Sequence, residues 1–166
     1  NKIKKNYKKI LSVKILEECV MKVSNKLELT IGFIGAGNMG LPMIKNLIKK
    51  GFQVKVYDIN PKITKKLEKD NIKAVNNLRA VASNQFIISI LPDTQAVESV
   101  YNSETGINSY LKPGTIVIDM STIASSSAIE IGKTLQKMQI EFLDAPVSGG
   151  VKGASNANLS IMIGGK

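Results

Sequence analysis

Short apolar runs alternate with amphipathic segments from residue 29 onward. The apolar runs predict strands at residues 29–34, 52–57, 72–75, 86–91, 115–119, 140–143 and 159–163. The intervening segments have the 3.6-residue periodicity of helices, at residues 39–50, from Pro61 onward, and at 78–83, 94–101 and 125–138. Strands separated by helices of this length need right-handed crossovers between parallel neighbours. The predicted fold class is therefore α/β, with a doubly wound, mainly parallel sheet.

The first part of the chain is set apart by its charge. The formal net charge is +10, and residues 1–30 carry eight lysines against three glutamates. Residues 1–16 have no acidic side chain, and their apolar positions line one face of a helix, which is typical of a mitochondrial transit segment. The alternatives are a solvated tail and a nucleic-acid-binding arm. We expect residues 1–27 to be a flexible basic leader and residues 28–166 to be one domain, located in mitochondria or the cytoplasm.

Composition excludes several kinds of chemistry. The chain has no histidine and one cysteine, Cys19. This removes Ser-His and Cys-His nucleophile pairs, most zinc sites and any intramolecular disulfide. No metal site is predicted. No apolar run reaches the ~18–20 residues of a membrane span, so no membrane partner is predicted either.

A glycine-rich turn follows the first predicted strand, with the sequence Gly35-Ala36-Gly37-Asn38-Met39-Gly40. It matches GxGxxG and has a strand before it, a helix after it and Asp58 at the end of the next strand. Gly35 would make the tight turn, Gly37 would let a diphosphate approach the backbone, and Gly40 would let helix and strand pack closely. The helix N-terminus attracts the anion. The pattern predicts a Rossmann dinucleotide site.

The carboxylate of Asp58 favours NAD over NADP. It would accept hydrogen bonds from the ribose hydroxyls of the adenosine and repel a 2′-phosphate. Lysines 62, 65 and 66 lie nearby and leave NADP as the weaker alternative. A flavin or S-adenosylmethionine site could use the same loop.

Four segments, spread from residue 31 to residue 150, resemble the 3-hydroxyisobutyrate dehydrogenases of the β-hydroxyacid dehydrogenase family. They are IGFIGAGNMGLPM at 31–43, LPD at 91–93, IDMSTI at 118–123 and DAPVSGG at 144–150. The resemblance begins near residue 30 and extends to the end in one register. It implies the N-terminal NAD-binding domain of an oxidoreductase that transfers a hydride between NAD and a small 3-hydroxy acid.

The resemblance also implies roles for individual residues. Besides the glycine loop and Asp58, the cofactor would contact Leu91, Pro92 and Thr122. The hydroxy acid or semialdehyde substrate would contact Ser121, Ser148, Gly149 and Gly150. Residues 148–150 would offer a concave run of backbone N–H groups to its carboxylate. The full-length enzyme would be a homo-oligomer.

Two departures from the family pattern bear on activity and on the backbone. The family's catalytic lysine would lie beyond Lys166, so we expect residues 1–166 alone to be inactive. Ala157 stands where family members carry a glycine, at a cost of ~1 kcal/mol if that position needs positive φ.

Three other functions remain open. One is a non-catalytic dinucleotide-binding or interaction module with a nucleic-acid-binding arm, and another is a tartronate semialdehyde or glyoxylate reductase. The third is a 6-phosphogluconate dehydrogenase-like enzyme, against which Asp58 argues because that enzyme would need to accept a 2′-phosphate.

Overall fold

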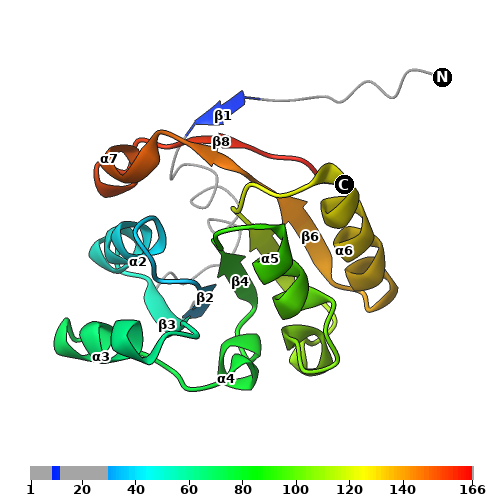
Figure 1. Cartoon of the computed structure of the whole chain (residues 1–166), viewed down its shortest axis with the longest axis horizontal. Helices are drawn as coiled ribbons and strands as arrows, with labels where there is room; N and C mark the ends of the chain where they lie inside the picture. Colours follow the sequence, from blue (N-terminus) through cyan, green and yellow to red (C-terminus); the bar gives the residue numbers. More distant parts are fainter. Residues whose placement is uncertain (1–8, 12–29, 166) are drawn as a thin grey trace.

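A parallel sheet of five strands forms the centre of the molecule (Figure 1). The computed structural model describes residues 9–11 and 30–165. The strand order is β3-β2-β4-β5-β6, and every neighbouring pair is parallel. The strands are β2 (Thr30–Ile34), β3 (Gln53–Tyr57), β4 (Phe86–Ser89), β5 (Ile116–Asp119) and β6 (Glu141–Asp144). The predicted α/β class is confirmed.

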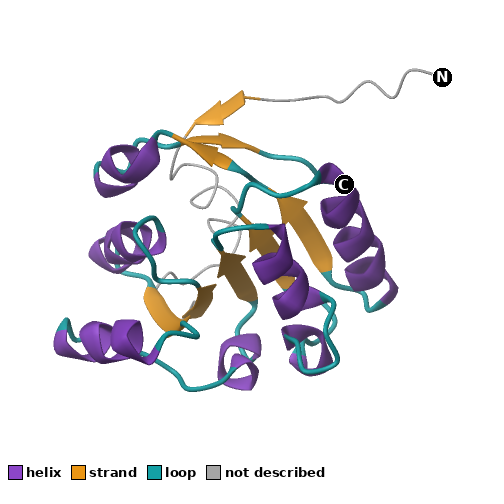
Figure 2. Cartoon of the chain, in the orientation of Figure 1, coloured by secondary structure: helices purple, strands orange, loops and turns teal. Residues whose placement is uncertain are grey.

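Helices cover both faces of this sheet (Figure 2). One face packs against α2 (Gly40–Lys49) and α3 (Pro61–Lys69). The other face packs against α4 (Leu78–Ala82), α5 (Thr94–Tyr101), the 3₁₀ helix η2 (Ile107–Tyr110) and α6 (Ser125–Lys137). Strand β4 is buried at all four positions because both of its faces are covered, which explains its continuous apolar sequence.

Three helices begin at a capping side chain that the sequence supplies, whereas α2 and α6 begin without one. The side chains of Asn60, Asn77 and Asp93 cap the N-termini of α3, α4 and α5 by accepting hydrogen bonds from backbone N–H groups. Helix α2 begins without a capping side chain and has no acidic residue in its first turn. No capping or acidic side chain of the helix itself therefore offsets the positive end of its dipole, which attracts anions.

The strand predicted at residues 72–75 is reduced to a single bridge. Val56 in β3 pairs in parallel with Ala74, through hydrogen bonds of 2.9 Å from Val56 N to Lys73 O and 2.8 Å from Val75 N to Val56 O. Asn71, with φ of 55°, and the capping Asn77 bound this segment on either side. With this bridge, successive strands extend the sheet first to one side of β2 and then, from β4 onward, to the other side, which is the doubly wound pattern.

The last predicted strand belongs to a second sheet. β8 (Ser160–Met162) pairs antiparallel with β7 (Val147–Ser148) and with β1 (Lys9–Leu11). The short helix α7 (Gly150–Ser155) connects β7 to β8. An antiparallel bridge between Asp144 and Gly164 joins this sheet to the edge of β6.

Strand β1 lies within the predicted basic leader, where the sequence pattern suggested a helical face and not a strand. It pairs with β8 from Lys9 opposite Met162 to Leu11 opposite Ser160. The remainder of the predicted leader, residues 1–8 and 12–27, lies outside the described residues, so its role stays a prediction. No helix of the described part of the chain is long and apolar enough to span a membrane.

Candidate functional site

The glycine loop lies at the carboxyl edge of the sheet, where the chain leaves β2 for α2. Gly35 adopts φ of +92°, and its N–H donates to Tyr57 O at 2.9 Å. A Cβ atom on Gly35 would lie 2.3 Å from Ile90 O, and one on Gly40 would lie 2.0 Å from Gly35 O. Both positions therefore exclude any side chain, as the sequence predicted.

Gly37 differs from the other two glycines of the motif. It is exposed, its φ lies outside the left-handed region, and no atom lies within 4 Å of the position its Cβ would take. The fold itself does not require glycine here. An open glycine at the start of an uncapped helix is what a diphosphate needs to approach the backbone.

Asp58 is tied to the glycine loop. Its Oδ2 accepts the N–H of Ala36 at 2.8 Å, and its Oδ1 accepts the N–H of Asn60 at 2.8 Å. A carboxylate has about four acceptor positions, so capacity remains for ribose hydroxyls. A cavity of about 340 Å³ opens beside it, lined by Tyr57, Asp58, Ile59, Pro61, Thr64, Lys65, Glu68, Val75 and Asn76. The predicted carboxylate thus lies at a cavity next to the loop, with Lys65 on the cavity wall.

The turn after β4 interlocks with the glycine loop. Ile90 N donates to Ile34 O at 3.0 Å, and the Leu91 side chain lies against Gly35, with its Cδ2 atom 3.0 Å from the Cβ position of that glycine. The N–H of Leu91 donates to Ser121 Oγ at 2.9 Å. The Leu-Pro turn and the segment after β5 therefore meet at the edge that carries the glycine loop.

A buried polar cluster supports this edge. Asp119 Oδ1 accepts the hydroxyls of Ser89 and Ser121, each at 2.7 Å, and Tyr101 OH donates to Ser89 Oγ at 2.9 Å. Among the described residues, Asp119 Oδ2 is buried without a hydrogen-bond partner. Burial raises the pKa of Asp119 above its ordinary value of 3.8, although the hydrogen bonds from Ser121 and Ser89 lower it. Burial and the charge of Asp119 raise the pKa of Tyr101, so its hydroxyl stays protonated and donates.

Sequence reasoning missed this cluster. The sequence feature that could have revealed the cluster is the presence of polar residues in strands predicted to be buried. These residues are Ser89 within the apolar run 86–91 and Asp119 at the end of 115–119. Both side chains have an exposed fraction of 0%. Buried polar groups need hydrogen-bond partners, but the sequence does not say which partners the fold supplies.

The predicted substrate residues fall in two different environments. Ser148, Gly149 and Gly150 are exposed at the junction of β7 and α7, where Gly149 and Gly150 have φ of +132° and +60°. Ser121 is only 1% exposed, and its hydroxyl both donates and accepts within the protein. Thr122, next to it, is exposed, as is Pro92. The geometry suits Thr122 and residues 148–150 for ligand contact and gives Ser121 an internal role.

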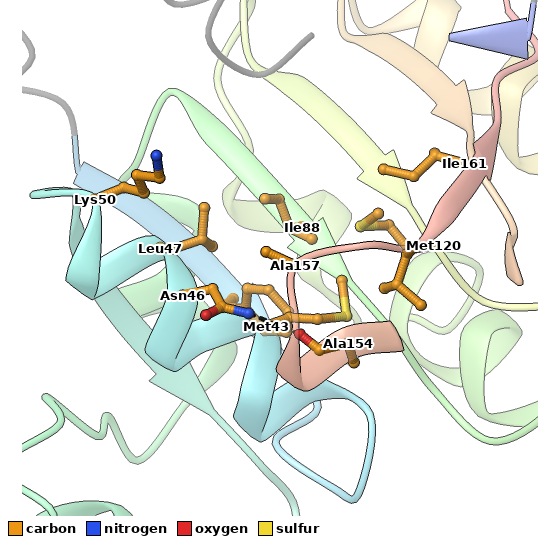
Figure 3. A pocket seen from close by; sticks show the side chains of 11 residues that line it. Met43, Asn46, Leu47, Lys50, Ile88, Met120, Ala154, Ala157 and Ile161 are labelled. Atoms are coloured by element: carbon orange, nitrogen blue, oxygen red, sulfur yellow. Dashed lines mark hydrogen bonds between the residues drawn. The ribbon is translucent and has the colours of Figure 1, made fainter. Parts of the chain in front are cut away.

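A small apolar cavity of about 70 Å³ lies between α2, α7 and the sheet (Figure 3). Asn46 in α2 crosses to α7, where its Nδ2 donates to Ala154 O at 2.7 Å. Ala157, which lines the same cavity, has φ of +53°. Position 157, where family members carry glycine, therefore has the positive φ at which alanine is expected from the sequence to be unfavourable.

Fold and site together define a dinucleotide-binding Rossmann domain. Residues 30–166 match the family described as the NAD binding domain of 6-phosphogluconate dehydrogenase, and the chain belongs to this family. The predicted cofactor, NAD, is confirmed. Within residues 9–11 and 30–165, no group of three histidine, cysteine or carboxylate side chains could hold a metal ion.

The similar proteins include several named hydroxyacid dehydrogenases. The chain is 41% identical over 136 residues to mouse mitochondrial 3-hydroxyisobutyrate dehydrogenase, covering 81% of this chain and 41% of the mouse protein. It is 40% identical to the NAD-dependent L-serine dehydrogenase of Pseudomonas aeruginosa, covering 81% and 46%. The structure of Mycobacterium tuberculosis 3-hydroxyisobutyrate dehydrogenase with L-serine superposes with a TM-score of 0.77 at 36% identity, covering 83% and 47%. The predicted resemblance is confirmed, and the chain spans less than half the length of these relatives.

Proposed function

We propose that this chain supplies the NAD-binding half of a dehydrogenase that oxidises a small 3-hydroxy acid of the 3-hydroxyisobutyrate type. The observation that carries the proposal is the open Gly37 at the uncapped start of α2, beside a carboxylate fixed to the same loop. The relatives named for 3-hydroxyisobutyrate and L-serine support a short 3-hydroxy acid as the substrate.

In this proposal, the parts of the cofactor lie in order along the carboxyl edge of the sheet. Asp58 follows β3 and would hold the adenosine ribose, and the glycine loop follows β2 and would hold the diphosphate. The segments after β4 and β5 would flank the nicotinamide half, through Leu91, Pro92 and Thr122. NAD, when bound, supplies the hydride acceptor. Ser148, Gly149 and Gly150 would orient the substrate carboxylate through backbone N–H groups and one hydroxyl.

The proton-transferring lysine implied by the family resemblance is expected beyond Lys166. Residues 1–166 alone are therefore expected to bind NAD without measurable turnover. Steady oxidation of 3-hydroxyisobutyrate by residues 1–166 alone would contradict this part of the proposal.

Calorimetric titration with NAD and NADP tests the cofactor assignment. The wild-type chain is expected to prefer NAD. Asp58→Arg is expected to weaken NAD binding at least about tenfold, equivalent to about 1.4 kcal/mol, and to favour NADP relative to NAD. Glu130→Arg is the matched control, since it makes the same charge change at an exposed position of α6 without lining the cavity beside Asp58. An unchanged cofactor preference in a folded Asp58→Arg variant would refute the role of Asp58.

A further inference from the structure

Ser121 is placed between a buried carboxylate and a backbone N–H of the candidate cofactor site. Its Oγ lies 2.7 Å from Asp119 Oδ1 and 2.9 Å from Leu91 N. A serine hydroxyl has one proton, and a carboxylate can only accept. The proton of Ser121 therefore points to Asp119, and an oxygen lone pair faces the Leu91 N–H.

The hydroxyl groups of the cluster all donate toward Asp119. Tyr101 OH donates to Ser89 Oγ, and the hydroxyls of Ser89 and Ser121 both donate to Asp119 Oδ1. Ser89 and Asp119 have no exposed surface and Ser121 is 1% exposed, so a bound molecule cannot reach these side chains. Tyr101, Ser89 and Asp119 form one series of hydrogen bonds in which each donor polarises the next group, and Ser121 donates to the carboxylate separately.

The hydrogen-bonded cluster of Asp119 and Ser121 holds the turn after β4, which touches the glycine loop. Leu91 lies against Gly35, and Ile90 O closes off the position of a Gly35 side chain. The hydrogen bond to Ser121 thus fixes the Leu91 N–H at the carboxyl ends of β4 and β5. Asp58 lies at the carboxyl end of β3, on the other side of β2. A displacement of this turn would change the surface offered to the nicotinamide half of the cofactor and leave the adenosine cavity intact.

We propose that Asp119 and Ser121 are positioning residues that hold the Leu91–Pro92 turn in place for the nicotinamide half of NAD. Ser121 then acts on the cofactor site through Leu91, in place of the direct substrate contact that the family resemblance implied. The proposal rests on the NAD-binding function proposed above.

The structure supplies a matched pair of variants. Ser89→Ala and Ser121→Ala each remove one buried hydroxyl that donates to Asp119 Oδ1 at 2.7 Å, but only Ser121 also accepts the Leu91 N–H. Ser121→Ala is expected to raise the Kd for NAD about tenfold and to leave the Kd for AMP within about twofold. Ser89→Ala is expected to leave both values within about twofold.

Two results would overturn the proposal. One is an NAD affinity unchanged by Ser121→Ala, and the other is an equal loss in both serine variants or for both ligands, which would indicate a general loss of structure. Failure of the wild-type chain to bind NAD would instead reject the proposed function.

Two further measurements keep the proposal testable if Ser121→Ala does not fold. Asp119→Asn retains an acceptor for Ser121 and is expected to keep NAD affinity within about threefold, whereas Asp119→Ala is expected to lose about tenfold. Amide hydrogen exchange of Leu91 in the ligand-free chain is expected to accelerate in Asp119→Ala and to stay slow in Ser89→Ala. Equal exchange rates in these two variants would contradict the proposal without reference to any ligand.

Discussion

Replacing Gly37 with alanine adds one methyl group where the diphosphate is proposed to approach the backbone. Nothing lies within 4 Å of that methyl position, and the φ of Gly37 is one that alanine can adopt. The same replacement at Gly40 would place the methyl carbon 2.0 Å from Gly35 O. One chemical change therefore separates the binding role from the packing role within a single motif.

The magnitudes follow from these contacts. Gly37→Ala should leave the free energy of unfolding unchanged or raise it by about 0.4–1 kcal/mol, because alanine restricts the unfolded chain. The methyl group would cost at least one charge-assisted hydrogen bond to the diphosphate, about 1.5–3 kcal/mol, or about 10–100-fold in the Kd for NAD. Gly40→Ala should destabilise the fold by about 1–3 kcal/mol or more, because backbone atoms must shift to admit the methyl group.

Urea unfolding and calorimetric titration with NAD on the same preparations measure both quantities. Gly51→Ala is the control, because Gly51 has open space around it but φ of +90°. It should lower stability by about 1 kcal/mol and leave the Kd for NAD unchanged. A folded Gly37→Ala variant with wild-type NAD affinity would show that the diphosphate does not lie against Gly37.

Three further predictions concern stability. Ala157→Gly should raise the free energy of unfolding by about 0.5–1 kcal/mol, because Ala157 has φ of +53°. Ala154→Gly, within α7, should lower it by a similar amount, and thermal unfolding of both variants checks the sign. Asn46→Asp should lower it by about 1–3 kcal/mol in urea unfolding, since a carboxylate would replace the donor to Ala154 O. For Asp119, burial raises the folded-state pKa, so its stabilising contribution is complete below the ordinary value of 3.8 and declines as pH rises through the higher folded-state value. The stability of the wild type relative to Asp119→Asn should therefore fall as the pH rises above the ordinary carboxyl pKa of 3.8, and parallel pH profiles would contradict the burial argument.

The parts of the site that could be predicted are local in the sequence. Gly35, Gly37 and Gly40 occur within six residues, and Asp58 directly follows the next strand of the main sheet. Parallel strands bring their carboxyl ends to one edge, so the order of strands was enough to place them together. In the structure, Ala36 N donates to Asp58 at 2.8 Å, so the loop and the carboxylate lie together.

The parts that could not be predicted depend on packing between distant segments. Ser89 and Asp119 are 30 residues apart, and so are Leu91 and Ser121. Their hydrogen bonds exist only because β4 and β5 pair in one register, with Ser89 opposite Asp119. Periodicity identifies strands but does not fix the register between them. The same limit explains why the two-residue strand β7 and the pairing of β1 with β8 were not predicted.

The two backbone hydrogen bonds accepted by Asp58 have a consequence for the evolution of cofactor choice. A mutation to a cationic residue that welcomes a phosphorylated ribose would also remove the acceptor that ties the turn after β3 to Ala36. A lineage that switches cofactor must therefore restore that tether with a second mutation, or tolerate a looser diphosphate loop while it is missing. The same side chain, Asp58, thus sets cofactor specificity and the rigidity of the diphosphate loop, so a mutation that changes the specificity also changes the rigidity.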